Sequence, residues 1–369
     1  TELHFNEGLK GIDYSFGDCT GLVSISLPNS LERSKETFGS AQESAFTKQG
    51  NVYYLGNTEN PYVFLAKIDS GTENITLSPK TKCLPQSYFW NNYNIGTLNF
   101  DGTLEEWFDY AQILFDEEHC LNNFGELYFK NEKLQGEIVI PNTLTKITKN
   151  MFKSQTDITN VVIPNTITGI GDHAFYGCSS LTSVVLPNSV ESIGDSSFAD
   201  CTSLEHITLS NSLKYIDPYS FRNTALTEVS IPNSVEELGF AVFYECTNLK
   251  NILIPSSVTK IGNAFAAWTN SDLKIYYNGT NEQWNQIEIG DGNDELNNKI
   301  FVPSLSDLIS AVKNNNYSLE TNSLTYDFDG GNILFNSNIY VKEGNQYVGY
   351  TLVAENNKVR FNLYQKKLK

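Results

Sequence analysis

The sequence predicts an α/β solenoid of short parallel strands built from repeats of about 23 residues. A proline recurs at residues 141, 164, 187, 232 and 255, with Ser210 in the same place, so the steps are 23, 23, 23, 22 and 23 residues. Apolar residues recur at fixed offsets from these positions. Self-similarity at a fixed period of this length indicates stacked structural repeats.

Each repeat divides into a strand and a return segment. In "LTSVVLP" (181–187) apolar and polar residues alternate, which predicts a short strand with Leu181, Val184 and Leu186 facing inward and Ser183 and Val185 facing outward. The proline then stops the strand, because it cannot donate a ladder hydrogen bond. The return segment, "NSVESIGDSSFADCTS", carries Val190, Ile193 and Phe198 on one side and suits an irregular or short helical arc.

One repeat is too small to bury its own apolar side. Stacked repeats bury it by aligning equivalent residues into ladders with a spacing of about 4.8 Å. The 22-residue step coincides with "SFRNTAL", which is one residue shorter than "SFADCTSL". We therefore expect each coil to act as the template for the next.

The repeats resemble the BspA-type leucine-rich repeat. The family pattern "IPNSVxxIGxxAFxxCxxLxxIxI" reads here "IPNTITGIGDHAFYGCSSLTSVVL" and "LPNSVESIGDSSFADCTSLEHITL", in a run from about 134 to 265. Further copies lie at 14–31, where Ser34 replaces the expected isoleucine, and from residue 75, where Leu77, Leu84 and Phe89 precede a strand with Ile95, Leu98 and Phe100. The resemblance predicts one leucine-rich-repeat domain over 1–302, with inserts at about 40–74 and 101–133 and the short strands on its concave face.

Three kinds of segment resemble accessory parts of this family. They are "YYLGNTENPY" (53–62), "LYFKNEKLQGEIVIP" (127–141), and the pair "GTLEEW" (102–107) and "GTNEQW" (279–284). We expect each Gly-Thr stretch to turn the chain and start a short helix whose tryptophan packs over the core.

The last part of the chain, 303–369, has a different pattern. "SLSDLISAVKNN" predicts a helix with Ser304 or Ser306 at its N-cap, and four strand-like runs follow, with turns at Gly330-Gly331 and Asn356-Asn357. This predicts a small α+β module, which either caps the open end of the solenoid or binds a partner.

Composition narrows the function classes. The net charge of −18 argues against nucleic acid, whose binding needs clustered Lys and Arg, and no apolar run is long enough to span a bilayer. The chain starts at Thr1 without a signal peptide, so we interpret it as a trimmed or mature form whose export signal and anchor lie outside it. The sequence predicts no cofactor and no metal site, because it has neither CxxC nor HExxH.

The cysteines follow the repeat. Cys19, Cys178, Cys201 and Cys246 each come three residues after a ladder phenylalanine, whereas Cys83 and Cys120 do not. Regular placement favours buried free thiols over catalytic ones. A disulfide between Cys178 and Cys201 stays open, since stacked coils bring the two close.

The outward strand positions are the predicted binding site. We expect a protein-binding concave face formed by Glu137, Val139, Asn160, Val162, Ser183, Val185, His206, Thr208, Glu228, Ser230, Asn251 and Leu253. The same β-branched residues also simply favour strand formation.

Other clusters support weaker alternatives. "FDEEHC" (115–120) gathers carboxylates beside a histidine, but an acidic run is usually a solvated face, and "YDFDGG" (326–331) lacks the ligand spacing of a calcium loop. Aromatic stretches "SYFWNNYN" (87–94), Tyr53-Tyr54 and Tyr276-Tyr277 could stack on sugars. The aromatic stretches give the alternative function, a glycan-binding module for polysaccharide capture.

The resemblance implies the main function. It points to a non-enzymatic bacterial protein, secreted or attached to the cell surface, that binds host extracellular-matrix proteins, host cell-surface proteins or other cells.

Overall fold

A computed structural model describes residues 1–12, 19–34, 38, 41–82, 95–114 and 124–301, together with strand residues between 325 and 368. The chain forms two compact units. The first holds residues 1–136 and 148–158, and the second holds 137–147 and 159–369. The domain boundary expected at 302 stays a prediction, because residues 302–324 lie outside the described part.

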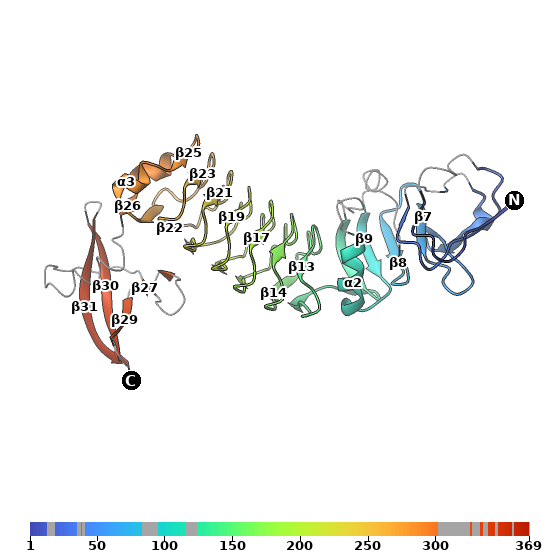
Figure 1. Ribbon diagram of the computed structural model, residues 1–369, viewed down its shortest axis with the longest axis horizontal. Helices are drawn as coiled ribbons and strands as arrows, with labels where there is room; N and C mark the ends of the chain where they lie inside the picture. The colour runs from blue at the N-terminus through green and yellow to red at the C-terminus, as the bar shows by residue number, and fades with distance from the viewer. Residues whose placement is uncertain are drawn as a thin grey trace. The chain divides into compact units, whose positions relative to one another are not determined.

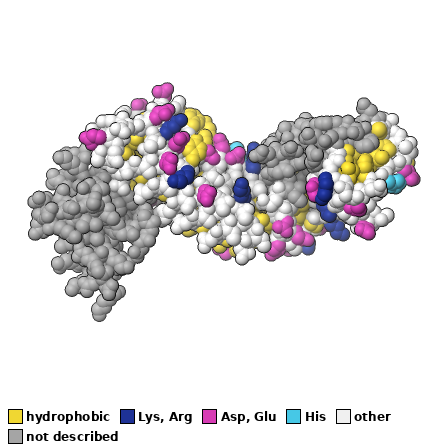
Figure 2. Space-filling model, in the orientation of Figure 1, with side chains coloured by type: hydrophobic (Ala, Val, Ile, Leu, Met, Phe, Trp, Pro, Cys, Tyr) yellow, Lys and Arg dark blue, Asp and Glu magenta, His cyan; other side chains and the backbone are white. Residues whose placement is uncertain are grey.

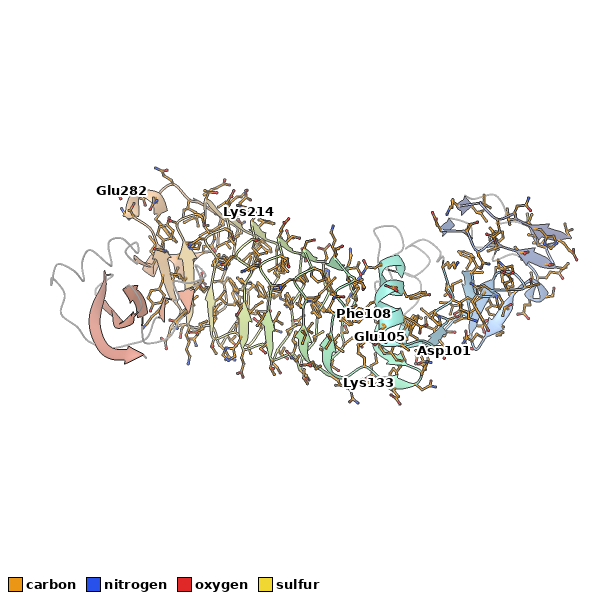
Figure 3. All side chains as sticks on the ribbon, turned by 60° about the horizontal axis from the view of Figure 1, so that its bottom comes forward. Asp101, Glu105, Phe108, Lys133, Lys214 and Glu282 are labelled. Atoms are coloured by element: carbon orange, nitrogen blue, oxygen red, sulfur yellow. The ribbon has the colours of Figure 1, made fainter. Side chains whose placement is uncertain are left out.

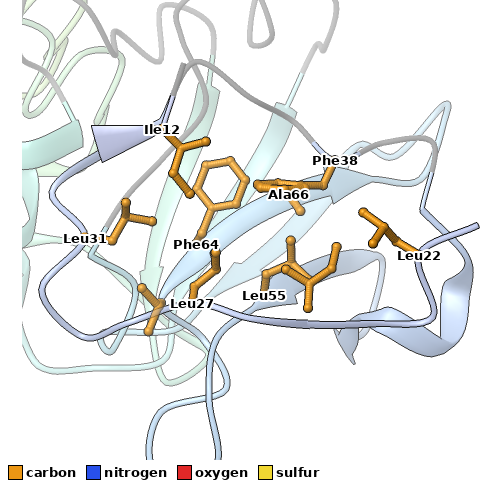
Figure 4. Close-up of a cluster of buried hydrophobic side chains, with 10 residues drawn as sticks. Ile12, Leu22, Leu27, Leu31, Phe38, Leu55, Phe64 and Ala66 are labelled. Atoms are coloured by element: carbon orange, nitrogen blue, oxygen red, sulfur yellow. The ribbon is translucent and has the colours of Figure 1, made fainter. Parts of the chain in front are cut away.

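The first unit begins with two pairs of very short parallel strands. β1 (Glu2–His4) pairs with β3 (Ser24–Ser26), and β2 (Gly11–Ile12) pairs with β4 (Arg33–Ser34). The register joins residues 22 positions apart, so this segment is a coil of the predicted kind. Figure 4 shows the side chains that it buries, among them Leu27 and Phe38 at 0 % exposure.

The first insert is an antiparallel sheet. η1 (Glu43–Ala45) leads into β5 (Thr47–Gln49), β6 (Val52–Leu55) and β7 (Phe64–Ile68), which pair in that order. Phe64 and Leu55 join the cluster of Figure 4, so the insert contributes to the same core as the coil before it.

The second insert follows two parallel strands. β8 (Asn74–Leu77), β9 (Ile95–Phe100) and β10 (Phe124–Phe129) run parallel, and β10 turns back into β11 (Glu132–Lys133). Lys133 Nζ lies 2.6 Å from Glu126 Oε1 and 2.8 Å from Asp157 Oδ2, so it ties this hairpin to the loop at 157 (Figure 3). Ile95, Leu98 and Phe100 are all buried, as expected.

Both Gly-Thr stretches start helices, which confirms the prediction. α2 (Leu104–Leu114) follows Thr103, whose hydroxyl accepts from Glu106 N, and α3 (Asn281–Trp284) has the equivalent capping box at Thr280. Figure 3 labels Glu105 and Phe108 on α2 and Glu282 on α3.

The two motifs share one packing arrangement. Trp107 contacts Phe100 edge-on at 5.4 Å between ring centroids, and Trp284 contacts Tyr277 in the same way at 4.8 Å. The glycine is required because a Cβ on Gly102 would lie 2.5 Å from the Phe100 ring. Both tryptophans are buried, at 0 % and 4 % exposure.

The second unit consists of stacked coils, with two strands to each coil (Figure 1). The longer strands are β12 (Gly136–Val139), β14 (Ile158–Val162), β16 (Ser183–Val185), β18 (His206–Thr208), β20 (Glu228–Ser230), β22 (Asn251–Pro255), β24 (Lys274–Asn278) and β26 (Ile300–Phe301). The two-residue strands are β13 (Lys146–Ile147), β15 (Gly169–Ile170), β17 (Ser192–Ile193), β19 (Tyr215–Ile216), β21 (Glu237–Leu238), β23 (Lys260–Ile261) and β25 (Glu288–Ile289), in one seven-stranded ladder. This is the predicted leucine-rich-repeat solenoid.

The interior of the coils is a set of aligned ladders. Phe175, Phe198, Phe221 and Phe243 stack in order, with centroids 5.3, 5.7 and 5.6 Å apart and rings within 12° of parallel. All four are fully buried. Identical residues in register therefore carry the packing from coil to coil.

A glycine beside the two-residue strands allows neighbouring coils to lie close to each other. We call this position the glycine slot; it holds Gly171, Gly194, Asp217, Gly239 and Gly262. A Cβ on Gly194 would lie 2.5 Å from Asp172 Oδ1, and one on Gly262 would lie 2.6 Å from the Gly239 carbonyl carbon. Such distances are closer than side chains tolerate, so the slot favours glycine.

The longer strands form two sheets. One has the order β12-β14-β16-β18, and the other begins at β20 and continues through β22, β24 and β26. Within each sheet the strands are parallel and in register, with Val185 opposite Thr208 and Ser230 opposite Leu253.

The C-terminal strands continue the second sheet. β31 (Lys358–Leu368) pairs with β26 and with β30 (Gln346–Glu355), which pairs with β29 (Ile339–Glu343), while β27 (Thr325–Tyr326) and β28 (Ile333–Leu334) form a separate pair. The last solenoid helix is η2 (Asp294–Asn298). The predicted helix after Pro303 and both predicted turns lie outside the described residues.

Candidate functional site

The strands place the predicted binding residues in two columns on one side of the coils. Asn160 is opposite Ser183 and Ser183 is opposite His206, while Val185 is opposite Thr208 two residues further along. The inward neighbours, Val184 and Ile207, are likewise opposite each other. We call the outward side the strand face.

Three valines of the strand face are exposed. Val139, Val162 and Val185 have 56 %, 44 % and 64 % of their surface accessible. We call these three residues the valine row. They lie on β12, β14 and β16, so the row spans two strand spacings, about 10 Å. Exposed aliphatic side chains on adjacent strands form an apolar surface that no other described part of the chain covers.

The second column is polar. Glu137 and His206 are exposed, Asn160 and Ser183 are half-buried, and Asn160 Nδ2 donates to Glu137 Oε2 at 2.6 Å. These groups border the valine row on one side. Half-buried Thr208 occupies the equivalent position on the next strand, β18, and so continues the row. The surface therefore combines an apolar strip with a mildly acidic, hydrogen-bonding margin.

The expectation that Leu253 lies on this surface is wrong. Leu253 is 1 % exposed, and Tyr276, opposite it on β24, is 6 % exposed. Side chains at paired positions of neighbouring strands share a face, so Leu253 and Tyr276 belong to a covered part of it. Glu228, Ser230 and Asn251 are half-buried, and burial raises the pKa of Glu228. The open part of the strand face is thus the part from β12 to β18.

The cysteines of the coils are buried free thiols, as expected. Cys178, Cys201 and Cys246 are unpaired by disulfides and fully buried, and Cys19 is half-buried. Cys201 Sγ donates to Phe175 O at 3.1 Å, and Cys246 Sγ donates to Phe221 O at 3.0 Å. These hydrogen bonds to backbone carbonyls indicate a structural role for the two thiols.

Thr224 shows what the cysteine position requires. It occupies that position in the 22-residue coil, and its Oγ1 donates to Phe221 O at 3.0 Å and lies 3.3 Å from Cys246 Sγ. A small side chain with one hydrogen-bond donor therefore fits the position, whether the donor is S–H or O–H.

An acidic group lies at the glycine slot. Asp217 replaces glycine there, and burial together with the charges of Asp172 and Asp195 raises the pKa of Asp217 to about 6. The Asp217 N–H···O bond to Ile193 is 3.4 Å long, against 2.8 Å for the equivalent bond of Gly194. Within the described residues, no group of three or more His, Cys, Asp or Glu is arranged to hold a metal ion.

The structure contradicts the alternative site at the tyrosine pairs, and the other alternative sites lie outside the described residues. Tyr53, Tyr54, Tyr276 and Tyr277 are 2 %, 0 %, 6 % and 0 % exposed, so the proposal that these pairs stack on sugars is wrong. The chain buries them because they belong to strands β6 and β24 at inward or covered positions. The stretches 115–120 and 87–94, and residues 327–331, lie outside the described part.

Sequence reasoning missed Trp268, the most exposed aromatic residue among those that the structure describes. Trp268 has 72 % of its surface accessible and stacks against Tyr244, with centroids 5.9 Å apart and rings 28° from parallel. The sequence signal for this residue is its place in the repeat. Trp268 comes six residues after the glycine slot, at the position that Gly177, Asp200 and Asn223 occupy in preceding coils.

Charges on the visible face are mixed. Figure 2 shows Asp and Glu interspersed with Lys and Arg. One ion pair joins Lys214 Nζ and Glu236 Oε1, which lie 3.3 Å apart. Of the helices that the structure describes, none combines the length and the apolar character needed to cross a bilayer.

Comparison with known proteins gives one family. The BspA type leucine rich repeat region, in six copies, matches residues 1–115, 62–158, 122–242 and 168–301. No curated protein matches the chain.

The solved structures that are similar to the chain include leucine-rich repeat proteins. One from Bacteroides ovatus is 18 % identical, with 79 % of this chain and 70 % of that chain covered and a TM-score of 0.36. The pneumococcal vaccine antigen PcpA is 15 % identical, with 82 % and 91 % covered and a TM-score of 0.35. A leucine-rich cell surface protein of Faecalibacterium prausnitzii is 17 % identical, with 66 % and 97 % covered and a TM-score of 0.29.

Proposed function

Because the chain belongs to the BspA-type leucine-rich repeat family, we propose that it is a bacterial protein displayed on the cell surface or secreted, which binds a protein partner through the strand face. The observation that carries this proposal is the valine row. Val139, Val162 and Val185 are exposed on neighbouring strands, and an apolar surface of this kind gains free energy when a partner covers it. Host matrix proteins, host cell-surface proteins and other cells are the candidate partners that the family implies.

The negative charge of the chain supports a partner whose binding surface is basic. The chain carries a net charge of −18, and Glu137 borders the valine row. A protein with an apolar patch rimmed by Lys and Arg complements such a surface. Complementary charge speeds encounter and weakens with salt, because the screening length is about 8 Å at physiological ionic strength.

A non-enzymatic role agrees with this surface. The valine row lies among amides, hydroxyls and single carboxylates, and Cys201 and Cys246 are buried structural groups. Family membership supports the same conclusion, because leucine-rich repeats of this kind are binding scaffolds.

The test is binding of the purified chain to immobilised extracellular-matrix proteins and to whole cells, measured by interferometry. The variant carries Val162→Glu and Val185→Lys, which removes two exposed valines, keeps the net charge, and avoids like charges on neighbouring strands. The matched control is Val23→Glu, a substitution of another exposed valine in the first unit.

The expected result is a protein ligand whose affinity falls at least about tenfold in the double variant, a loss of about 1.4 kcal/mol. The control binds as the unchanged chain does, and circular dichroism shows both variants folded. Retention of binding by the folded double variant would reject the strand face, and failure of every protein and cell sample to bind would reject adhesion.

A further inference from the structure

The turn after the phenylalanine ladder contains a strained backbone position. The residue six positions after the glycine slot is Gly177, Asp200, Asn223, Glu245 and Trp268 in successive coils, with φ of 71°, 59°, 53°, 61° and 61°. A ladder of hydrogen bonds fixes this conformation, since the N–H of Asn223 donates to Tyr244 O and that of Glu245 donates to Ala267 O.

Tryptophan is an unfavourable residue at this position. Glycine adopts the left-handed region freely, and Asp and Asn tolerate it, but a bulky side chain there is an outlier. Trp268 gains little packing in return, because 72 % of its surface is accessible. Strain that packing does not explain points to a function of the side chain.

The indole ring is held in place by a second aromatic ring. Tyr244, half-buried on the preceding coil, stacks on Trp268 with centroids 5.9 Å apart and an angle of 28°. We call this pair the aromatic platform. One face of the indole rests on the tyrosine, and the remaining surface offers a flat apolar area to solvent.

A row of planar polar side chains adjoins the platform on the preceding coils. Arg222 Nε and Nη2 lie 3.2 and 3.0 Å from Glu245 Oε2, and Asn223 Nδ2 donates to Asp200 Oδ1 at 2.8 Å. Their side chains are partly exposed, at 35 % for Arg222, 33 % for Glu245 and 24 % for Asp200. We call Asp200, Arg222, Asn223 and Glu245 the polar ridge.

We propose that the aromatic platform and the polar ridge together form a binding site for an uncharged oligosaccharide. The face of a pyranose that carries C–H groups is apolar and packs on an aromatic face, while its hydroxyls need paired donors and acceptors at the rim. The ridge supplies both, in orientations already fixed by its own hydrogen bonds. Its length, three coil spacings from Asp200 to Trp268 or about 14 Å, exceeds a single ring.

The charges indicate a neutral sugar. On the ridge, Arg222 pairs with Glu245 and lies 4.0 Å from Asp200, so the guanidinium is already engaged. The net charge of −18 disfavours an anionic polymer. Trp, Tyr and Arg also anchor protein interfaces, but such anchors lie in an apolar patch, whereas the coil before Trp268 carries Glu245, which pairs with Arg222.

This site is independent of the valine row, and its test uses different variants. The probes are cellotetraose, maltotetraose, laminaritetraose, mannotetraose and chitotetraose, titrated by calorimetry. Acrylamide quenching of tryptophan fluorescence, compared with and without each sugar, reports on the exposed indole. Trp107 and Trp284 are buried, and the difference between the unchanged chain and Trp268→Gly isolates Trp268.

The variants separate binding from folding. Trp268→Gly places at this position the residue that the coil of Gly177 already has, so the melting temperature should stay the same or rise. Arg222→Gln breaks the ridge and leaves the platform, and Val185→Asn serves as the control on the strand face.

The expected result is binding of at least one sugar, protection of Trp268 from acrylamide, and a loss of affinity of about tenfold or more in Trp268→Gly. The Val185→Asn control binds equally well. Three results would each overturn the proposal: no sugar binds at millimolar concentration, Trp268→Gly binds as tightly as the unchanged chain, or Trp268→Gly lowers the melting temperature and so shows a structural role.

Discussion

Asp217 is the residue at which the glycine slot holds a charged side chain. Burial and the neighbouring Asp172 and Asp195 raise the pKa of Asp217 from 3.8 to about 6. A raised carboxyl pKa means that the folded state binds the proton more tightly than the unfolded state. The stability of the fold should therefore fall as the pH rises from about 4 to about 6, and level off above that range.

The magnitude follows from the shift. Two pKa units correspond to about 3 kcal/mol, but Asp217 is only half-buried, and solvent screening reduces the effect to about 1 kcal/mol. Asp217→Asn removes the charge and keeps the size, so at pH 7.5 it should stabilise the chain by about 1 kcal/mol and at pH 4 by almost nothing.

A second variant separates charge from size. Asp217→Gly restores the residue found at Gly194 and Gly239, and it allows the 3.4 Å bond to Ile193 O to shorten toward the 2.8 Å of its neighbours. The stability that Asp217→Gly gains from closer contact between coils should not depend on pH, whereas the stability that it gains from loss of the charge should.

The assay is unfolding in urea at pH 4, 5, 6 and 7.5, followed by circular dichroism, because guanidinium chloride would screen the charges. Asp272→Asn, at an exposed site, is the control. If the stability difference between Asp217→Asn and the unchanged chain is the same at pH 4 and pH 7.5, the electrostatic reasoning is wrong.

Three more predictions concern the ladders. Phe198→Ala should lower the free energy of unfolding by about 3–5 kcal/mol, because it empties a fully buried place between two stacked rings; urea unfolding with a loss below about 1 kcal/mol would contradict the ladder as a source of stability. Thr224→Cys should be nearly neutral and Thr224→Val should cost about 1 kcal/mol, because cysteine keeps a buried hydrogen-bond donor at this position and valine does not; equal melting temperatures for the two variants would refute the hydrogen-bond argument. The thiols of Cys201 and Cys246 should not react with a disulfide reagent at pH 8 until the chain unfolds, because burial raises both pKa values, that of Cys246 to about 11; fast labelling of the native chain would count against this.

Much of the architecture was predictable from spacing. The proline period set the strand positions, and the two Gly-Thr stretches indicated helices because glycine, the N-cap threonine and the tryptophan act together within six residues. These are local features, so they can be read without knowing what lies beside them.

The errors came from neighbours that are distant in sequence. Leu253 has the same spacing as Val185, but it is buried, and so is Tyr276 opposite it on the next strand. The coil at Gly262 also departs from the side-chain pattern: Phe265 lies three residues after the slot, where preceding coils have Ser197, Ser220 and Val242, and Ala266 takes the ladder position. The hydrogen bond from Phe243 N to Phe265 O keeps the backbone register of the preceding coils. The displaced phenylalanine and the exposure of Trp268 concern individual side chains, whose surroundings the spacing alone does not determine.

The division between β18 and β20 has a mechanical consequence. On the side of the longer strands the backbone ladder is interrupted there, while the two-residue strands and the stacked phenylalanines continue past the same point. A stack of coils that is joined on one side and open on the other bends most easily at the interruption. Opening at this point breaks no ladder hydrogen bonds of the longer strands, so a pulling force would separate the coils of β18 and β20 more easily than described coils that are joined by both ladders.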